Sequence, residues 1–251
     1  MTRFFTNFYR DLKVLYSLAI KRGRGATAEE RLESFYSGQA EEYDHFRRRL
    51  LTGREELMSS LAPEPGAIWV DMGCGTGSNL ELLPKEGLAQ LQRAYMIDLT
   101  ESMLKVAEAR ISRNGWQNVT TRRADATEPW GLEEPVDVVF FSYSLSMIPD
   151  WFAALDRAYE ALKPGGLIGV VDFYIARKPP YNIRSKQSFS TRWLWPLWFS
   201  FDNVFLSSDV LPYLERKFTE VKLIERADRM PYCPFFWKKT PRFVFIGRKS
   251  S

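Results

Sequence analysis

The chain has 251 residues, of which 45% are hydrophobic and 26% are charged, so it is long enough to bury a core beneath an ordinary polar surface. This composition excludes disordered, collagen-like and small disulfide-linked proteins, and two cysteines favour a reduced, cytoplasmic setting. A single histidine leaves no histidine-based metal site, and we expect no metal. No apolar run reaches the ~20 residues that a membrane-spanning helix needs.

The formal net charge of +4 is unevenly distributed along the chain. Residues 1–25 carry six basic groups and one acid, whereas residues 26–174 carry fourteen basic groups against twenty-four acids. Residues 175–200 carry five basic groups and no acid, and residues 226–251 carry seven and one. Basic ends and a basic insert around an acidic middle predict local contact with a phosphate-rich surface, lipid or nucleic acid, unless these side chains only solvate a surface.

Residues 1–25 are predicted to form a basic amphipathic helix followed by a flexible linker of glycine and basic residues. Charges interrupt its apolar residues and no small-residue cleavage site follows, so it is not typical of a secretory signal. Such a helix either packs on the domain or lies on a membrane surface. Residues 26–251 are expected to form one domain.

The domain alternates between helical and strand patterns, which predicts a parallel sheet with helices on both faces. The expected helices are 28–61, 102–114 and 150–161, and the expected strands are 67–71, 93–98, 119–123, 136–141 and 167–172. Residues 163–166 are expected to form the turn that ends the last helix. The final strands, 220–225 and 242–247, have no helical pattern between them and should pair antiparallel as an edge hairpin.

A glycine-rich loop, Gly73-Cys74-Gly75-Thr76-Gly77, directly follows the first buried strand. Open α/β sheets bind ligands outside the carboxyl ends of their strands, and glycines let the backbone approach a ligand closely. The dinucleotide-binding motif would need a glycine where this chain has Ser78, and the second mononucleotide half is missing. A dinucleotide is therefore disfavoured.

Aspartates lie at the ends of the first two strands of the predicted sheet and just after the third. Asp98 could accept hydrogen bonds from both ribose hydroxyls of a nucleoside, and Asp125 from the exocyclic amine of an adenine. Asp71 could organise the glycine loop or meet an ammonium group. Each aspartate alone is equally well explained as a loop cap, but together with the glycine loop they predict a nucleoside site.

These features, with the turn Leu162-Lys163-Pro164-Gly165-Gly166, resemble a class I S-adenosylmethionine-dependent methyltransferase. The resemblance covers roughly residues 35–250. It implies an α/β, Rossmann-like fold with a seven-stranded sheet that is mostly parallel, its last strand antiparallel, and helices on both faces. It also implies S-adenosylmethionine as the methyl donor.

Two short segments are similar to betaine-lipid methyltransferases, which trimethylate the amine of diacylglyceryl-homoserine. The first contains Phe35-Tyr36-Ser37-Gly38-Gln39-Ala40 with Tyr43-Asp44. The second is Met230-Pro231-Tyr232 ahead of Phe243-Val244-Phe245-Ile246-Gly247-Arg248-Lys249. In eukaryotes these enzymes resemble one half of a two-domain synthase. The resemblance therefore implies a separate aminocarboxypropyl-transferring enzyme as a partner.

Together the residues and the resemblance predict a set of donor-binding residues. They are Tyr36, Gln39, Tyr43, Arg47, Asp71, Gly73, Cys74, Gly75, Gly77, Asp98, Leu99, Met103, Asp125, Ala126, Ser142 and Tyr143. Tyr36 and Tyr43, seven positions apart, share a helical face that either meets the donor or docks the helix. Tyr143 and Tyr36 are the predicted catalytic residues. Tyr143, after the fourth strand, either contacts the acceptor amine or packs beneath a lid.

An insert at 173–206 combines aromatic and basic residues and is predicted to cover the substrate. Nine aromatic residues lie between 173 and 201, without an acid among them. This pattern fits a buried aromatic cluster, a membrane interface where Trp193, Trp195 and Trp198 would act as anchors, or, least of the three, single-stranded nucleic acid.

We therefore expect a methyltransferase that is cytoplasmic and peripheral to the membrane. It is expected to methylate successively the amine of a lipid head group, with diacylglyceryl-homoserine as the first choice of acceptor. A phosphatidylethanolamine or quinone-precursor methyltransferase is the near alternative. A non-catalytic subunit that binds an adenosyl ligand is the alternative from another class.

Overall fold

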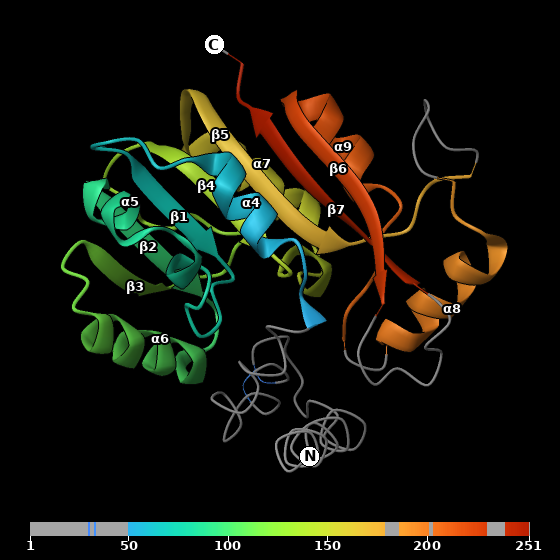
Figure 1. Ribbon diagram of the computed structural model, residues 1–251, viewed down its shortest axis with the longest axis horizontal. Helices are drawn as coiled ribbons and strands as arrows, with labels where there is room; N and C mark the ends of the chain where they lie inside the picture. Colours follow the sequence, from blue (N-terminus) through green and yellow to red (C-terminus); the bar gives the residue numbers. More distant parts are fainter. Residues whose placement is uncertain are drawn as a thin grey trace.

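The structure, a computed structural model, describes Glu30, Glu33 and residues 50–178, 186–200, 203–229 and 239–250. Seven strands form one twisted sheet between two layers of helices (Figure 1). The strands are β1 (Ile68–Met72), β2 (Arg93–Asp98), β3 (Val119–Arg123), β4 (Val136–Ser142), β5 (Leu162–Phe173), β6 (Thr219–Arg229) and β7 (Lys239–Arg248). The helices are α4 (Arg54–Leu61), α5 (Lys85–Gln90), α6 (Glu101–Asn114), α7 (Trp151–Ala161), α8 (Phe189–Ser200) and α9 (Val210–Lys217), with short 3₁₀ helices η1 (Leu80–Leu82) and η2 (Leu145–Met147).

The sheet has the strand order β3-β2-β1-β4-β5-β7-β6. The pairs from β3 to β5 are parallel, whereas β7 runs antiparallel to both β5 and β6. The predicted fold class is thereby confirmed. The hairpin does lie at the edge, but its second strand is inserted next to β5, so β6 is the outer strand and is mainly exposed while β7 is buried.

Alternating side chains of the central strands fill two separate cores, one on each face of the sheet. On β1, Trp69 packs with α4, α5 and α6, whereas Ile68 and Val70 pack with α7 and α9. Because both faces are covered, the strands read as continuous apolar runs in the sequence. The carboxyl ends of β1 to β5 therefore meet at one open edge, which is where the candidate site lies.

Two expected elements differ in the structure. The helix expected over 28–61 is interrupted before α4, because Gly53 adopts a left-handed φ of 84°. Residues 163–166, expected as a turn, lie within β5, where the partner of Val136 is Leu162 but that of Val138 is Leu167. This bulge keeps the backbone paired with the end of the chain, since Gly165 N donates to the carbonyl of Lys249.

The aromatic insert is divided between core and surface. Phe173 and Tyr174, at the end of β5, are buried, and so are Trp195 and Phe199 of α8. Trp195 was expected to act with Trp193 and Trp198 as a membrane anchor, but it is fully buried and donates from Nε1 to the carbonyl of Lys239 at 2.9 Å. In the part of the chain that is described, no helix is long and apolar enough to cross a bilayer.

Candidate active site

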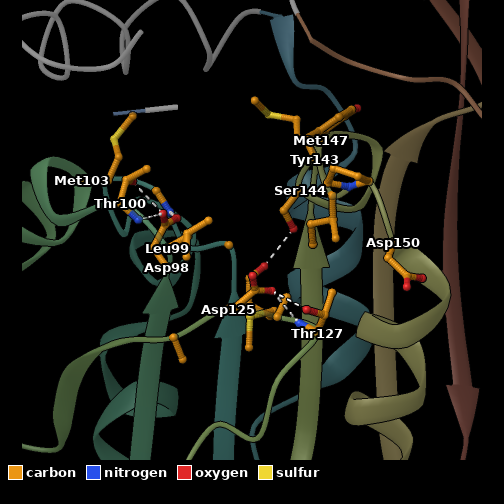
Figure 2. A pocket seen from close by; sticks show the side chains of 17 residues that line it. Asp98, Leu99, Thr100, Met103, Asp125, Thr127, Tyr143, Ser144, Met147 and Asp150 are labelled. Atoms are coloured by element: carbon orange, nitrogen blue, oxygen red, sulfur yellow. Dashed lines mark hydrogen bonds between the residues drawn. The ribbon is translucent and has the colours of Figure 1, made fainter. Parts of the chain in front are cut away.

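A cavity of about 280 Å³ opens at the carboxyl ends of β1, β2, β3 and β4 (Figure 2). Its lining residues come from the loops that follow these four strands. They are Met72, Gly73, Gly75, Asp98, Leu99, Thr100, Met103, Ala124, Asp125, Ala126, Thr127, Tyr143, Ser144, Met147, Ile148, Pro149 and Asp150. The position is the one where open α/β sheets bind ligands.

The glycine loop forms the floor of this cavity. Gly73, Gly75 and Gly77 have φ values of 69°, 55° and 73°, which side chains with a Cβ rarely adopt. The backbone N–H groups of Gly73 and Cys74 both donate to the carbonyl of Ile97, so the loop is tied to the end of β2. A Cβ on Gly73 would lie 2.4 Å from that of Ser144, so the loops after β1 and β4 approach as closely as glycine permits.

Asp98, the last residue of β2, joins the glycine loop to the start of α6. Its Oδ2 accepts from Gly75 N at 2.8 Å, and its Oδ1 accepts from the backbone and hydroxyl of Thr100. Asp125 holds its own loop in the same way, because its Oδ1 accepts from the backbone and hydroxyl of Thr127. Oδ2 of Asp125 accepts no hydrogen bond from any described residue. Both carboxylates therefore face the cavity in fixed orientations.

A second layer of buried polar groups holds the glycine loop from behind. Both carboxylate oxygens of Asp71 accept from Nδ2 of Asn79, whose Oδ1 accepts from Nε of Arg54 at 2.9 Å. Arg110 of α6 donates from Nε to the carbonyl of Thr76. Asp71 thus organises the loop and does not line the cavity. These contacts connect α4 and α6 to the backbone that a ligand would touch.

Tyr143, directly after β4, forms part of the opposite wall. Its φ of 57° is unusual for a residue with a side chain, and such strained backbone clusters at functional sites. Its ring lies 4.6 Å from that of Phe173, centroid to centroid, and its hydroxyl donates to the carbonyl of Thr52 at 2.5 Å. Burial raises the pKa of Tyr143 above its ordinary value, so the hydroxyl stays protonated.

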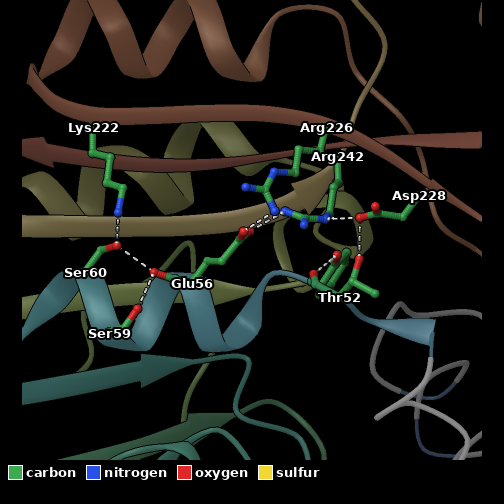
Figure 3. A network of polar contacts seen from close by, with 9 residues as sticks. Thr52, Glu56, Ser59, Ser60, Lys222, Arg226, Asp228 and Arg242 are labelled. Atoms are coloured by element: carbon green, nitrogen blue, oxygen red, sulfur yellow. Dashed lines mark hydrogen bonds and ion pairs between the residues drawn. The ribbon is translucent and has the colours of Figure 1, made fainter.

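The Thr52 segment is held by a network of charged groups between α4 and the final hairpin (Figure 3). The Thr52 hydroxyl donates to Asp228 at 2.8 Å, and the same carboxylate accepts from Nε of Arg242. Arg242 is buried and also pairs with Glu56, which in turn pairs with Arg226. Burial acts to raise the pKa of Asp228, but the hydrogen bonds from Arg242 and Thr52 outweigh it, and the pKa is lowered.

A buried carboxylate holds the far wall of the cavity. Asp172, near the end of β5, accepts from the backbone and hydroxyl of Ser146 at 3.0 and 2.7 Å. Ser146 belongs to η2, which carries the lining residue Met147. Burial raises the pKa of Asp172 to about 6 despite these hydrogen bonds.

The cavity brings together about half of the donor-binding residues that were predicted from the sequence. Those that line it are Gly73, Gly75, Asp98, Leu99, Met103, Asp125, Ala126 and Tyr143. Four others, Asp71, Cys74, Gly77 and Ser142, lie near it without lining it. Tyr36, Gln39, Tyr43 and Arg47 lie outside the described residues, and so does the helix predicted within residues 1–25.

Sequence reasoning missed the wall that continues from Met147 to Asp150. Met147, Ile148 and Pro149 give it an apolar surface, and Asp150 ends it with a carboxylate. Asp150 also caps α7, since its Oδ1 accepts from Ala153 N at 3.1 Å. An aspartate before an apolar helix signals such a cap, but the sequence does not show that it also lines a cavity.

Comparison with known proteins identifies the class. Residues 70–166 match the family model of a methyltransferase domain. The chain is 25% identical over 174 residues to a demethylmenaquinone methyltransferase of Geobacillus stearothermophilus, an alignment that covers 67% of this chain and 73% of that one. For the corresponding enzyme of Anoxybacillus flavithermus the identity is 26% over 145 residues, covering 56% and 61%.

Solved structures share the fold at low sequence identity. The phosphoethanolamine N-methyltransferase 2 of Haemonchus contortus, solved with phosphomonomethylethanolamine and S-adenosylhomocysteine, has a TM-score of 0.68 at 16% identity, covering 90% of this chain and 61% of that one. The YcgJ protein of Bacillus subtilis has a TM-score of 0.63 at 13% identity, covering 79% and 98%.

The fold and the matched domain define an S-adenosylmethionine-dependent methyltransferase of class I. The site fits this donor: the glycine loop leaves room for close backbone approach, Asp98 is placed for ribose hydroxyls, and Oδ2 of Asp125 is left for an adenine amine. Among the described residues no cluster of side chains could hold a metal ion.

Proposed function

We propose that this enzyme is an N-methyltransferase that acts successively on the amine of a lipid head group. One observation carries the proposal: three aspartates line the cavity, Asp98, Asp125 and Asp150, and none of its described lining residues is basic. A negatively charged cavity favours an acceptor that becomes a cation during the reaction. It disfavours an acceptor that must first become an anion.

The donor supplies a methyl group carried on a sulfonium. The amine must attack it with a neutral nitrogen, so a C–S bond breaks as a C–N bond forms and the acceptor gains a positive charge. The product ammonium then loses a proton to water before the next transfer. Asp150, at the exposed rim, stabilises this ammonium electrostatically, and the Tyr143 ring offers an aromatic face.

The side chains that would orient the reactants lie on rigid elements. Asp98 and Asp125 are each locked by two or more hydrogen bonds, so they pay little conformational entropy on binding. Positioning of donor and acceptor can supply up to ~7–11 kcal/mol of barrier reduction in such reactions. The hydroxyl of Tyr143 is committed to Thr52, so we assign the acceptor contact to its ring.

We further propose diacylglyceryl-homoserine as the acceptor lipid. The similarity of residues 35–44, 230–232 and 243–249 to betaine-lipid methyltransferases supports this choice, and the apolar wall of Met147, Ile148 and Pro149 suits the glyceryl part of a lipid. If diacylglyceryl-homoserine is the acceptor, a separate aminocarboxypropyl-transferring enzyme adds its homoserine group. The structural neighbour that methylates phosphoethanolamine also acts on nitrogen, as its name says.

Quinone-precursor methylation is the second candidate, because the relatives cited above are named demethylmenaquinone methyltransferases.

One experiment distinguishes the two candidates. Purified enzyme with methyl-labelled donor should be offered diacylglyceryl-homoserine, phosphatidylethanolamine and demethylmenaquinone separately, and the products separated by thin-layer chromatography. We expect label in the betaine lipid, with mono- and dimethyl intermediates at early times. Label found only in menaquinone would mean that the methyl acceptor is a ring carbon of a quinone precursor and not an amine. The Asp98→Ala enzyme controls for contaminating activity.

A further inference from the structure

Helix α8 exposes a continuous apolar stripe. Phe189, Trp193 and Leu197 follow one another at intervals of four residues, so they share one helical face. Their side chains are 81%, 64% and 47% exposed, which places all three among the most exposed large apolar residues of the described chain. Scattered apolar residues are normal on a surface, but an aligned aromatic and aliphatic stripe marks a binding face.

The opposite face of α8 is fixed to the protein. Trp195 and Phe199 are buried, and Nε1 of Trp195 donates to the carbonyl of Lys239 at the start of β7. Phe199 also packs on Phe173, with ring centroids 4.7 Å apart. The helix therefore has no alternative orientation that would bury Phe189, Trp193 and Leu197 without breaking these contacts.

A short row of rings connects this helix to the cavity wall. Phe199 of α8 packs on Phe173, and Phe173 packs 4.6 Å from Tyr143, which lines the cavity. In Figure 1, α8 lies beyond the carboxyl end of β5, at the edge of the sheet where the cavity opens. The helix that carries the stripe is therefore joined to the cavity wall through these rings.

The chain segment that carries the stripe is basic. Residues 175–200 contain five basic residues and no acid, in contrast to the acidic middle of the chain. Lys178 and Lys186 are exposed, and Arg192 is half-buried on α8 itself. An anionic surface is complementary to this charge, and each basic residue close to such a surface strengthens binding by about fivefold.

We propose that α8 docks on an anionic lipid bilayer, with Phe189, Trp193 and Leu197 inserted at the level of the head groups and Lys178, Lys186 and Arg192 above them. This inference rests on the proposed function in one respect, since it supplies the route by which a lipid head group reaches the cavity. Single-stranded nucleic acid would use aromatic stacking and basic charge, but Leu197 has no ring to stack and occupies the same stripe.

The test is co-sedimentation of the full chain with vesicles that contain no amine acceptor, so its outcome does not depend on methyl transfer. Vesicles of phosphatidylcholine alone and of phosphatidylcholine mixed with phosphatidylglycerol should be compared at low and high salt. We expect binding to the anionic vesicles that weakens with salt. Changing Phe189→Ser, Trp193→Gln and Leu197→Gln together should weaken it about tenfold or more, since three apolar side chains no longer enter the interface.

Two control variants separate the contributions. Val221→Ser removes another exposed apolar side chain, on β6 and away from α8, and should leave vesicle binding unchanged. The second control variant removes three basic side chains and keeps the apolar stripe. It should flatten the salt dependence of vesicle binding, and it combines Lys178→Gln, Lys186→Gln and Arg192→Gln. Quenching of tryptophan fluorescence by brominated lipid gives a second readout, which should be strong in the wild type and reduced in Trp193→Phe.

The proposal is overturned if the wild type ignores anionic vesicles, or if the triple stripe variant, still folded by circular dichroism, binds them as the wild type does. Binding of a single-stranded oligonucleotide that is lost in the stripe variant, without vesicle binding, would assign the face to nucleic acid instead. If the stripe variant does not fold, the fluorescence experiment decides. Equal quenching by brominated lipid in wild type and Trp193→Phe would then overturn the proposed orientation of α8.

Discussion

The hydroxyl of Tyr143 donates a hydrogen bond to the backbone carbonyl of Thr52 over 2.5 Å, joining the cavity wall to a residue 91 positions earlier in the chain. Thr52 is held in turn by Asp228, which pairs with Arg242 on β7. One buried tyrosine therefore couples the cavity wall to the chain before α4 and to the final hairpin. The Tyr143 hydroxyl therefore has a structural role, because its proton is donated to the Thr52 carbonyl.

Replacing Tyr143 tests that assignment. We expect Tyr143→Phe to lower the free energy of unfolding by about 1 kcal/mol, the usual net value of one hydrogen bond, and to leave the affinity for S-adenosylhomocysteine within about twofold. Tyr143→Ala should lower turnover further, because the ring that we propose to contact the acceptor is lost. A large fall in turnover for the phenylalanine variant, without loss of stability, would assign the hydroxyl a direct role in handling the amine.

Asp98 and Asp150 should affect different substrates. We expect Asp98→Ala to weaken binding of S-adenosylhomocysteine by ~1.5–3 kcal/mol, because the variant loses the acceptor of Gly75 N and the carboxylate that we propose to bind the ribose hydroxyls. Asp150→Asn keeps an oxygen to cap α7 and should leave that affinity unchanged while raising KM for the amine. Calorimetric titration and steady-state kinetics measure the two effects. Equal donor affinity in folded Asp98→Ala and wild type would remove Asp98 from the donor site.

Gly73 and Gly115 form a matched pair, since both have positive φ, 69° and 67°. A Cβ on Gly73 would collide with Ser144, whereas nothing lies within 4 Å of a Cβ on Gly115. We expect Gly115→Ala to lower the unfolding free energy by about 1 kcal/mol, the cost of the left-handed backbone alone. Gly73→Ala should cost more and also weaken donor binding.

Ser144→Gly provides the rescue for this comparison, because it removes the atom that the new Cβ of Gly73→Ala would meet. Chemical denaturation and donor titration of the wild type, the two single variants and the double variant give the coupling free energy between Gly73 and Ser144. If the double variant is no more stable than Gly73→Ala, the close approach of the two loops does not explain the glycine.

Asp172 should make stability depend on pH. Its pKa is about 6 in the folded protein against an ordinary value of 3.8, so between these values the folded state holds a proton that the unfolded state has lost. The resulting stabilisation is complete below the lower value and disappears as pH rises through the upper one, a change of about 2–3 kcal/mol. Urea denaturation across this range should show the decline in wild type and a flatter profile in Asp172→Asn. Parallel profiles would place the titration on another group.

Much of the fold and part of the site could be predicted from residue pattern alone. Strands β2 and β3 were predicted with the bounds that the structure shows, although only β2 is a mainly buried apolar run and β3 is polar and mostly exposed or half-buried. Gly73, Asp98 and Asp125 could be placed together because carboxyl ends of parallel strands meet at one edge. These inferences depend on local periodicity and on a single topological rule.

Contacts between distant segments could not be predicted in this way. That Trp195 is buried while Trp193 is exposed depends on which face of α8 meets Phe173 and Lys239. Large apolar residues lie on both of these faces, so the sequence of the helix does not show which one is buried. The commitment of the Tyr143 hydroxyl to Thr52 likewise requires two segments to be brought together by the folded chain. Sequence periodicity therefore determined the sheet and its ligand-binding edge, whereas long-range packing alone decided which side chains at that edge remain free for chemistry or for a membrane.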